Sequence, residues 1–485
     1  MSTIQLQPIS QLQQFREELY QIFEARADAL MDLVDALCAS PWAQSVVELS
    51  LSPLFRREYS SINDAIAQVF QPSEPAKEGE ERRAWEQQIA QLIGSYLPAP
   101  QGRKFWLFGT DGVPVPRPYA QTLEDRTMVY QPTPVKGNKP VTIGHRYSVV
   151  AFLPEKEGAD APPWVVPLMV QRVTSEEKAP GVGAAQLTAL LGEETQPFAG
   201  ELCVHVADSE YSHVDYLGSV SGQSNLVNVV RVAGNRVFYR PAEEPEEAPG
   251  PGHPRWYGEA FDLKDPETWG PPDETAETTW TTRSGHTYQV RLEAWKNLLM
   301  RGTREHPMHR FPFTLIRVVV LDEAGQPVFR RALWLIVLGE RRGEVSLIEA
   351  WKAYGQRFDL EHYFRFGKQK LLLAGFQTPE VEHEENWLTV VQLASVQLWL
   401  GREMAEETVR PWERYLPRRA SGAMGPSRVQ RDWERIIRRI GTPAQAPKRR
   451  GKSPGRAPGT SPGRRPRQPV IKKSGQTPPP VSAKA

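Results

Sequence analysis

Cysteine is almost absent from this chain of 485 residues. Its two cysteines, Cys38 and Cys203, lie far apart in the sequence and fit no metal-binding spacing. This scarcity excludes a disulfide scaffold and a cysteine-based zinc site, and it suits a reducing compartment. The nine histidines include no pair spaced four residues apart, so a two-histidine metal site of the helical type is excluded as well.

Long apolar runs are also absent. The longest purely apolar run, 332–338, is far shorter than the roughly 20 residues needed to span a bilayer. The N-terminus lacks a basic segment followed by an apolar run, which a signal peptide would have. We therefore expect no membrane segment and a cytoplasmic protein.

Acidic residues are missing from one end of the chain. Residues 446–485 contain 11 Lys and Arg and no Asp or Glu, which leaves 48 basic and 58 acidic residues, a net charge of −10, in the remainder. A basic tail on an acidic body indicates a polyanionic partner. On the body itself, any surface that binds such a partner must be a local patch.

The chain does contain enough apolar and aromatic material for a sizeable core, with 40% hydrophobic residues and 14 Trp. Its length allows roughly two to four domains. Residues 1–99 are expected to be helical, because apolar residues recur at helical spacing up to about Phe70 and again over 84–96, with a polar linker at 71–82. Helicity alone leaves open whether this region is a structural bundle or a domain for DNA binding or dimerisation.

Residues 100–240 have a different pattern of apolar and turn residues. Short apolar runs bounded by turn residues predict buried strands. The predicted strands are 104–108, 128–130, 147–153, 202–206 and 227–232, and the predicted helix is 183–191. With a second helix placed between Asp208 and Val227, the order is three strands, a helix, a strand, a helix and a strand. That is the order of an RNase H-like α/β domain, a mixed sheet with flanking helices.

The rest of the chain is expected to form three further parts. Residues 241–331 are predicted to be a β-rich insertion with a hairpin turn at 322–326. Residues 332–440 return the chain to the first sheet and include a long helix over 378–406. Residues 441–485 contain too few apolar residues to offset the entropy of ordering, so they are predicted to be a disordered basic tail.

The helix predicted over 346–370 carries polar side chains along one stripe. Ser346 and Glu349 give the capping-box spacing at its start. Steps of three, four and seven residues keep the four members of the stripe on one helical face. They are Tyr354, Arg357, Glu361 and Lys368. A helix that served only to bury this face would have apolar residues there.

This spacing resembles a known signature. Tyr, two residues, Arg, three residues, Glu, six residues and Lys is the YREK pattern of DDE transposases from one large group of bacterial insertion sequences, and the four residues match it in identity and spacing. The resemblance covers roughly 106–400 and includes the strings 143–148, 207–209 and 333–335. The structural alternative is an exposed helix with ordinary ion pairs four residues apart.

The resemblance implies three catalytic carboxylates. Asp111 follows the first predicted strand, Asp208 follows the fourth, and Glu361 lies on the helix after the β insertion. In open α/β sheets, reactive groups gather near the carboxyl ends of the strands. Asp is also a common turn residue, and Glu210 and Asp215 are rivals for the second position.

The same carboxylates are expected to hold the metal. Two Mg²⁺ ions, with Mn²⁺ able to take their place, can bind the attacking and leaving oxygens of an in-line displacement at a phosphodiester. Mg²⁺ is a hard ion that takes carboxylate oxygens and waters. The resemblance further implies that Arg357 and Lys368 contact phosphates of the DNA. Tyr354 would give a hydroxyl to a phosphate or stack on a base.

The prediction is a DDE transposase that performs cut-and-paste transposition, in which it hydrolyses a strand at the element ends and joins the 3′-hydroxyl to target DNA. Its expected partners are the terminal inverted repeats and target DNA, bound by a homodimer, and its expected location is the cytoplasm, at the nucleoid. Trp256, Trp280 and Trp295 could stack on a flipped base, but each is expected to be a core residue.

Three alternatives remain open. The first is a catalytically silent DNA-binding protein derived from a transposase. The second is an RNase H-like nuclease or resolvase, which cleaves without joining and does not need the β insertion. The third is a hydrolase with a carboxylate pair as acid and base, whose activity would survive the removal of divalent metal.

Overall fold

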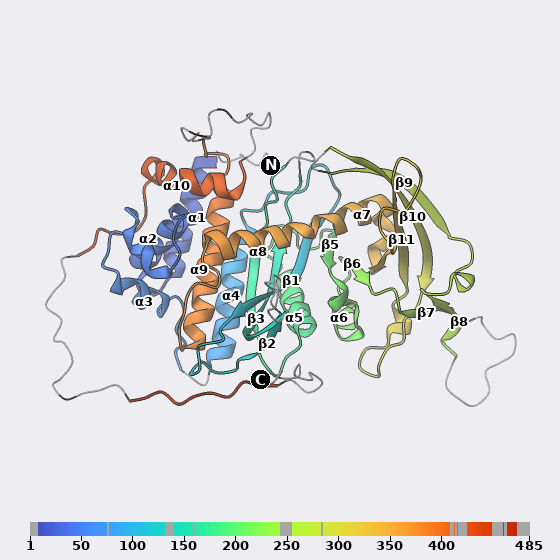
Figure 1. Cartoon of the computed structure of the whole chain (residues 1–485), viewed down its shortest axis with the longest axis horizontal. Coiled ribbons are helices and arrows are strands. Elements are labelled where there is room, and N and C mark those ends of the chain that lie inside the picture. The colour runs from blue at the N-terminus through green and yellow to red at the C-terminus, as the bar shows by residue number, and fades with distance from the viewer. Residues whose placement is uncertain are drawn as a thin grey trace, which may run out of the picture.

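Helices, a mixed sheet and a set of antiparallel strands follow one another along the long axis of the molecule (Figure 1). The computed structural model describes residues 8–74, 77–130, 140–156, 158, 161–242, 255–282, 285–407, 412, 415, 424–448, 459 and 463–472. The helices are α1 (Pro8–Ile22), α2 (Ala27–Ala39), α3 (Ser60–Ile66), α4 (Glu78–Gly94), α5 (Ala179–Leu191), α6 (Val214–Val220), α7 (Leu347–Gln356), α8 (Phe358–Lys370), α9 (Val381–Leu400) and α10 (Pro426–Ile440). The strands are β1 (Trp106–Pro116), β2 (Thr127–Tyr130), β3 (Val141–Phe152), β4 (Val166–Val173), β5 (Cys203–Ala207), β6 (Leu226–Val232), β7 (Val237–Pro241), β8 (Tyr257–Asp262), β9 (Glu274–Thr281), β10 (Thr287–Leu298), β11 (Phe313–Leu321) and β12 (Leu333–Leu338).

Most of the strands belong to one ten-stranded sheet. Its order is β2-β3-β1-β5-β6-β12-β11-β10-β9, and β4 also pairs with β3. β5 lies parallel to both β1 and β6, while the other neighbours in this sheet are antiparallel. The predicted fold class, a mixed α/β sheet with flanking helices that is interrupted in sequence by a β-rich insertion, is therefore confirmed.

The sequence missed one strand of the central sheet. β4 pairs with β3 on the edge opposite β1, whereas β2, which was predicted, pairs only with the first residues of β3. Pro167 lies in β4 opposite Ala151, where the pairing register shifts. Proline lacks the N–H group that a regular ladder needs, so it argues against a strand when only the sequence is known. At a register shift this N–H group is not required.

The β-rich region continues the central sheet. β12 pairs with β6 on one side and with β11 on the other, so β9–β11 extend the same sheet. The predicted hairpin turn is present, since the Asp322 N–H donates to the Gln326 carbonyl at 2.9 Å. The strand after this turn, β12, begins at Leu333, and residues 328–331 before it are exposed and lie beyond the β11–β12 pairing.

The N-terminal helices share one core with α9 and α10. Their buried apolar side chains belong to the same cluster as those of the sheet. The expected linker at 71–82 is partly helical, since α4 begins at Glu78 and has three glutamates in its first turn, where they favour the helix dipole. α10 was not predicted, and it buries Val429, Trp433 and Ile436.

The long helix after the polar stripe is shorter than expected. α9 begins at Val381 and ends at Leu400, whereas a helix over 378–406 was predicted. The hydroxyl of Thr378 accepts a hydrogen bond from the Glu380 N–H at 3.1 Å, which forms a turn ahead of the helix. In the part of the chain that the structure describes, no helix is long and apolar enough to cross a membrane.

The described part of the C-terminal region includes a short extended segment. Residues 463–472 lie beside the connection between β1 and β2, where the Gln468 N–H donates to the Gln121 carbonyl and the Ile471 N–H to the Arg126 carbonyl, each at 2.8 Å. Arg465 forms an ion pair with Glu380. The remainder of the predicted disordered tail, other than 441–448 and Gly459, lies outside the described residues.

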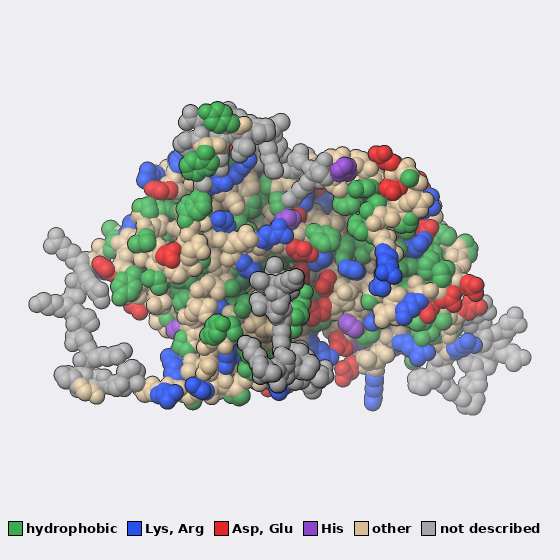
Figure 2. All heavy atoms as spheres, in the orientation of Figure 1, with side chains coloured by type: hydrophobic (Ala, Val, Ile, Leu, Met, Phe, Trp, Pro, Cys, Tyr) green, Lys and Arg blue, Asp and Glu red, His purple; other side chains and the backbone are tan. Residues whose placement is uncertain are grey.

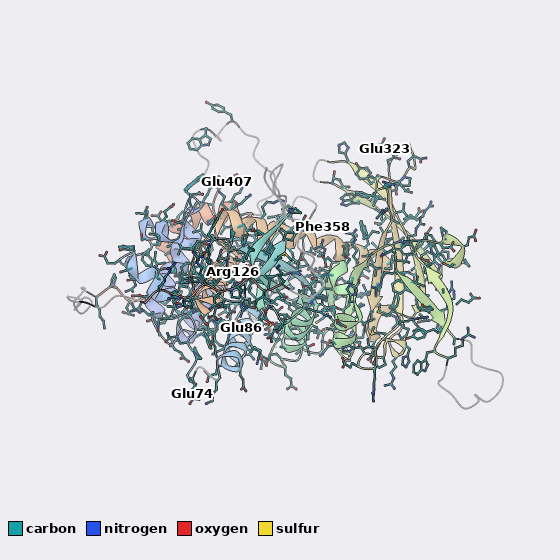
Figure 3. The ribbon with its side chains drawn as sticks, turned by 60° about the horizontal axis from the view of Figure 1, so that its bottom comes forward. Glu74, Glu86, Arg126, Glu323, Phe358 and Glu407 are labelled. Carbon is teal, nitrogen blue, oxygen red and sulfur yellow. The ribbon has the colours of Figure 1, made fainter. Side chains whose placement is uncertain are left out.

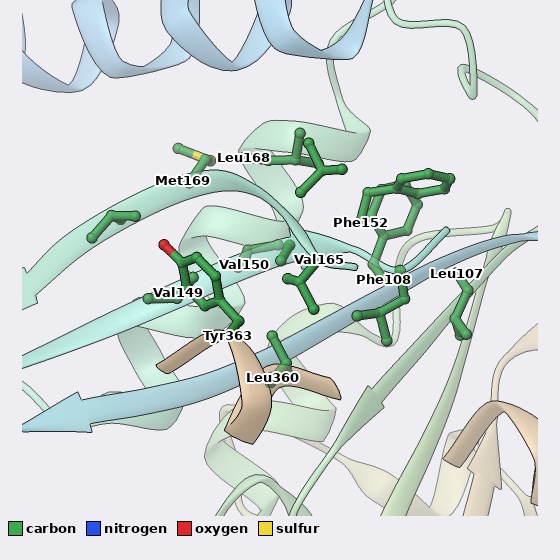
Figure 4. Close-up of a cluster of buried hydrophobic side chains, with 14 of the residues drawn as sticks. Leu107, Phe108, Val149, Val150, Phe152, Val165, Leu168, Met169, Leu360 and Tyr363 are labelled. Carbon is green, nitrogen blue, oxygen red and sulfur yellow. The ribbon is translucent and has the colours of Figure 1, made fainter. Parts of the chain in front are cut away.

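α8 is fixed on the sheet by its apolar side chains. Leu360 and Tyr363 point from α8 onto β1, β3 and β4, among Val149, Val150 and Leu168 (Figure 4). Leu360 is completely buried and lies against Gly109, where even a β-carbon would approach it within 3.0 Å. The polar stripe is therefore set beside a buried apolar stripe on the same helix.

Replacement of Leu360 by alanine should destabilise the protein strongly. We expect the free energy of unfolding to fall by about 2–5 kcal/mol, because a buried leucine leaves a cavity between α8 and β1. Arg365→Ala, at an exposed position of the same helix, should change it by about 0.5 kcal/mol or less. Urea unfolding of both variants measures the difference, and equal effects would contradict this packing.

Glu86 is a buried carboxyl group where α4 meets the sheet. It accepts a hydrogen bond from the Gln171 amide at 2.7 Å, and its side chain is 11% exposed. Figure 3 shows it within the body of the molecule, whereas Glu74 lies at the edge. Burial raises the pKa of Glu86 to about 7, although Arg82 at 3.9 Å acts in the opposite direction.

This raised pKa predicts a loss of stability as pH increases. Between about pH 4.5 and 7 the folded protein retains a proton on Glu86 that the unfolded chain has lost, so stability falls as pH rises through this window. Glu86→Gln should remove that fall and stabilise the protein above pH 7 by about 1–3 kcal/mol. Urea titrations across the window test this, with exposed Glu80→Gln as the control. The same pH dependence in Glu86→Gln and wild type would overturn the assignment.

Candidate active site

Asp111 and Asp208 are brought together by the register of two parallel strands. The last residue pair of the β1–β5 ladder is Gly109 with Val206. Each aspartate comes two residues after its member of that pair, so both reach the same level of the sheet. The electrostatic influence of Asp208 on Asp111 agrees with this proximity.

The two aspartates differ in their backbone settings. Asp208 directly follows β5, as predicted, and its carboxylate accepts the Glu210 N–H at 2.9 Å, which caps a short 3₁₀ turn. Asp111 was expected to follow its strand, but it lies inside β1. β1 continues to Pro116 because β3 still pairs with it after β5 has ended, with Asp111 opposite Val149.

The polar stripe begins with the predicted helix cap. Ser346 and Glu349 form both bonds of the capping box at the start of α7. The expected single helix is divided at Arg357, whose N–H donates to the Tyr354 carbonyl, while the Leu360 N–H donates to the Arg357 carbonyl. These three-residue steps tighten the turn. α7 and α8 nevertheless run in one direction across the face of the molecule (Figure 1).

The guanidinium of Arg357 joins the helix to the sheet. Its Nη1 lies 3.1 Å from Asp111 Oδ2, and its Nη2 lies 3.4 Å from Glu361 Oε1. Arg357 is 6% exposed, whereas the Glu361 side chain is 52% exposed. The carboxylates of the strand and of the helix therefore face one shared cation from opposite sides.

The surroundings raise the pKa values of both members of this pair. The net pKa of Asp111 is raised to about 6, chiefly by burial. Within this net value, Arg357 acts to lower the pKa and Asp208 acts to raise it. Burial alone would lower the pKa of Arg357, but Tyr354 and the nearby carboxylates raise it. Arg357 thus remains charged, and a second cation beside the two aspartates would relieve their mutual repulsion.

The rivals for the second aspartate have other partners. Glu210 forms an ion pair with Arg146 through both of its oxygens. Asp215 is exposed and binds Lys178 at 3.0 Å. Both rivals are therefore engaged by other cations, whereas Asp208 has no ion-pair partner among the described residues and acts electrostatically on both Asp111 and Arg357.

Tyr354 and Lys368 occupy different positions from Arg357 and Glu361. Tyr354 is 1% exposed and its ring lies beside the Arg357 guanidinium, so the expected stacking of this ring on a base has no exposed face to use. Phe358 is 48% exposed and is the accessible ring at this point of the helix. Lys368 lies about three turns beyond Arg357. Burial lowers its pKa, and no described residue is its hydrogen-bond or ion-pair partner.

A groove of about 2840 Å³ adjoins the carboxylates. Its lining includes Ser209, Tyr354 and Phe358, which are the neighbours of the acidic residues and not those residues themselves. Strands β9 and β11 form another wall, and Arg231 and Lys352 add positive charge. Figure 2 shows Asp and Glu side chains gathered near the middle of one face, with Lys and Arg on both sides.

The three tryptophans considered for base stacking differ in exposure. Trp295 is 2% exposed and its indole N–H donates to the Gly270 carbonyl at 3.3 Å, which confirms a core role. The same expectation was wrong for Trp256 and Trp280, which are 39% and 38% exposed. Both lie on the β-rich region, where few elements cover the sheet, and Trp280 lines the groove.

The sequence did not indicate the role of Arg146 or of the polar network below the aspartates. Arg146 fills the space beside Gly112, where a β-carbon would come within 2.6 Å of it. His205 is buried and hydrogen-bonded to Thr110 on β1 and Tyr216 on α6, and burial lowers its pKa to about 3. The string 143–148 contained the only sequence signal, since it includes Arg146.

The donor chemistry of the site fits divalent metal ions. Asp111, Asp208 and Glu361 offer hard carboxylate oxygens, which Mg²⁺ and Mn²⁺ prefer. Among the described residues, however, no three His, Cys, Asp or Glu side chains are close enough to hold one ion as they stand. Arg357 lies between two of the carboxylates, so all three can share an ion only if this guanidinium moves aside.

A family model described as "DDE superfamily endonuclease" matches residues 18–293, more than half of the chain. The chain belongs to this family. The match contains Asp111 and Asp208 and ends before the helix that carries Glu361. A comparison with curated protein sequences found no match. Membership supports a transposase-like nuclease that acts on DNA, and DDE endonucleases generally use divalent metal ions.

The contact between Arg357 and Asp111 predicts strong energetic coupling. Arg357→Gln should lower the free energy of unfolding by about 3 kcal/mol, because it leaves buried acidic groups without their cation. Adding Asp111→Asn should recover part of this loss, with a coupling energy of about 1–3 kcal/mol. Urea unfolding in the presence of a chelator measures the cycle. Arg365→Gln combined with Asp111→Asn is the control and should be additive; additivity in the Arg357 cycle would contradict the contact.

Proposed function

We propose that this DDE endonuclease is a cut-and-paste transposase. It hydrolyses a strand at the ends of its own element and transfers the 3′-hydroxyl to target DNA, with Mg²⁺ as its cofactor. The observation that supports this best is the convergence of Asp111 on β1, Asp208 after β5 and the Arg357–Glu361 pair. That pair lies on the two consecutive helices over 347–370, which we call the α7–α8 arm. The YREK spacing on these helices favours a transposase over other nucleases of the family.

The chemistry requires negative charge to be neutralised. A phosphodiester is anionic, and its in-line displacement builds further charge on the attacking and leaving oxygens. Bound divalent ions would neutralise this charge and activate water or a 3′-hydroxyl. Asp111, Asp208 and Glu361 would hold these ions, and no covalent intermediate with the protein is needed.

The cations of the polar stripe would bind phosphates of the DNA. Arg357 can donate two parallel N–H bonds to a phosphate once it leaves Asp111, which would open the carboxylates and bind the strand in one movement. Lys368 lacks a carboxylate partner among the described residues, so a phosphate would relieve the cost of its partial burial. The exposed ring of Phe358 can border the strand between them.

We further propose that the protein acts as a homodimer on the inverted repeats and that it works at the nucleoid. The proposed division is an end-binding or dimerisation region at 1–99, a catalytic domain at 100–240 and 332–440, the insertion at 241–331, and a basic tail at 441–485. The tail would add affinity that depends on salt and not on sequence. A binding-only derivative and a nuclease that cleaves without joining remain the alternatives to test.

Replacement of the carboxylates should abolish cleavage. With DNA that carries the element ends, Asp111→Asn, Asp208→Asn and Glu361→Gln should each lower the cleavage rate at least about 100-fold, and a chelator should do the same to the wild type. Gel analysis of labelled linear DNA measures both cleavage and joined products. Asp215→Asn, which removes an exposed and ion-paired carboxylate, is the matched control and should cleave normally.

The outcomes separate the alternatives. Metal-dependent cleavage followed by joined products supports the transposase. Cleavage without joining would favour the nuclease, and binding of the ends without cleavage would favour the silent derivative. Cleavage unchanged in Glu361→Gln would remove Glu361 from the site.

A further inference from the structure

An arginine-rich loop on the β-rich region lacks acidic partners. The loop joins β10 to β11, and its Arg301, Arg304 and Arg310 are all exposed. None of the three forms an ion pair with a carboxylate among the described residues. Some arginines elsewhere on this acidic protein do form such pairs, as half-exposed Arg341 does with Glu344 and exposed Arg438 does with Glu434.

The backbone of this loop is held in place. Leu299 and Tyr239 exchange two backbone hydrogen bonds of 2.8 and 2.9 Å at its start. Gly302 is packed so closely that a β-carbon there would lie 2.2 Å from the His306 carbonyl oxygen, and the Thr303 N–H donates to the same carbonyl at 2.9 Å. The arginines are therefore presented from a fixed surface, which lowers the entropy lost when they bind a partner.

Aromatic rings connect the loop to strands β7 and β8. The Arg301 guanidinium lies 4.8 Å from the centre of the Tyr239 ring, which in turn packs against Tyr257. Beside them, the rings of Trp256 and His309 are stacked at 3.8 Å with only 2° between their planes. Figure 2 shows Lys and Arg side chains over this β-rich part of the molecule.

The loop also lies beside the catalytic sheet. His306 packs against Gly218 of α6, where a β-carbon would approach it within 2.5 Å. α6 follows Asp208 by way of the short 3₁₀ turn. A long ligand held at the carboxylates could therefore extend across α6 to the arginines.

We propose that the surface formed by Arg301, Arg304 and Arg310, with the Trp256–His309 stack, binds the phosphate backbone of duplex DNA. The inference deepens the proposed function and takes from it the identity of the polyanion. Guanidinium groups without carboxylate partners match phosphates in charge and in their two-pronged geometry. On a body with a net charge of −10 outside the tail, this is the kind of local patch that DNA binding requires.

The test compares two charge-matched variants of the full chain. Arg301→Gln/Arg310→Gln removes two charges from the surface, whereas Arg341→Gln/Arg438→Gln removes two ion-paired arginines elsewhere. Binding of a short labelled duplex without element ends is followed by fluorescence anisotropy at several salt concentrations, with a chelator present. The first variant should bind about tenfold more weakly at physiological salt, and its salt slope should fall by about 0.9 for each phosphate that the protein no longer neutralises.

A second measurement does not depend on the variants. Modification of arginines by phenylglyoxal, located by mass spectrometry, should be slowed at Arg301, Arg304 and Arg310 when duplex is bound, and unchanged at Arg341. Equal binding and equal salt slopes for both variants, or no protection of the loop, would overturn the proposal. Competition by poly-glutamate as effective as by duplex would also overturn it, in favour of an acidic protein partner.

These results are independent of the carboxylates. Because the binding assay contains chelator and no element ends, failure of this surface to bind duplex has no bearing on cleavage at the element ends. If the wild type fails to cleave element ends while this surface still binds duplex, the proposed transposase function is contradicted and the proposed DNA-binding surface is not.

Discussion

The guanidinium of Arg357 ties together parts of the chain that lie 246 residues apart in sequence, since it contacts Asp111 on β1 from the α7–α8 arm. Without this cation, the buried carboxylate of Asp111 would face the carboxylates of Asp208 and Glu361 with nothing to offset their repulsion. This electrostatic requirement decides the local geometry. Under the proposed function, metal ions would neutralise the carboxylates when Arg357 leaves Asp111 to bind DNA.

Apolar packing supplies the precision that this contact alone would lack. Leu360 and Tyr363 fix the rotation of α8 on the sheet, so Arg357 and Glu361 project beside Asp111 and not into the core. The parallel pairing of β1 with β5 fixes the level of Asp208 in the same way. The polar network around His205 lies below both aspartates and joins β1, β5 and α6 through neutral hydrogen bonds.

The sequence predicted what depends on local pattern. The polar stripe, its capping box, most central strands and Asp208 at the end of β5 all follow from short-range periodicity and turn residues. It missed β4 because Pro167 has a role only at a register shift with β3. It placed Asp111 after its strand because the length of β1 depends on pairing with β3, and it missed Arg146 because that contact depends on the tertiary fold. The exposure of Trp256 and Trp280 likewise depends on which elements cover them.

The pairing of β6 with β12 has a consequence for how this architecture is assembled. Val232 lies opposite Trp334 in an antiparallel ladder, so the whole stretch 233–333 is, in chain topology, the loop of a single hairpin. A hairpin requires only a few residues to close, and the entropic cost of a longer loop grows slowly with its length. The whole β-rich region could therefore have been inserted at the single turn between β6 and β12 without a change in the order of β1, β3, β5 and β6 in the sheet. β12 then leads directly into the α7–α8 arm, so the pairing of β6 with β12, formed across this loop, places the start of the helices that carry Arg357 and Glu361.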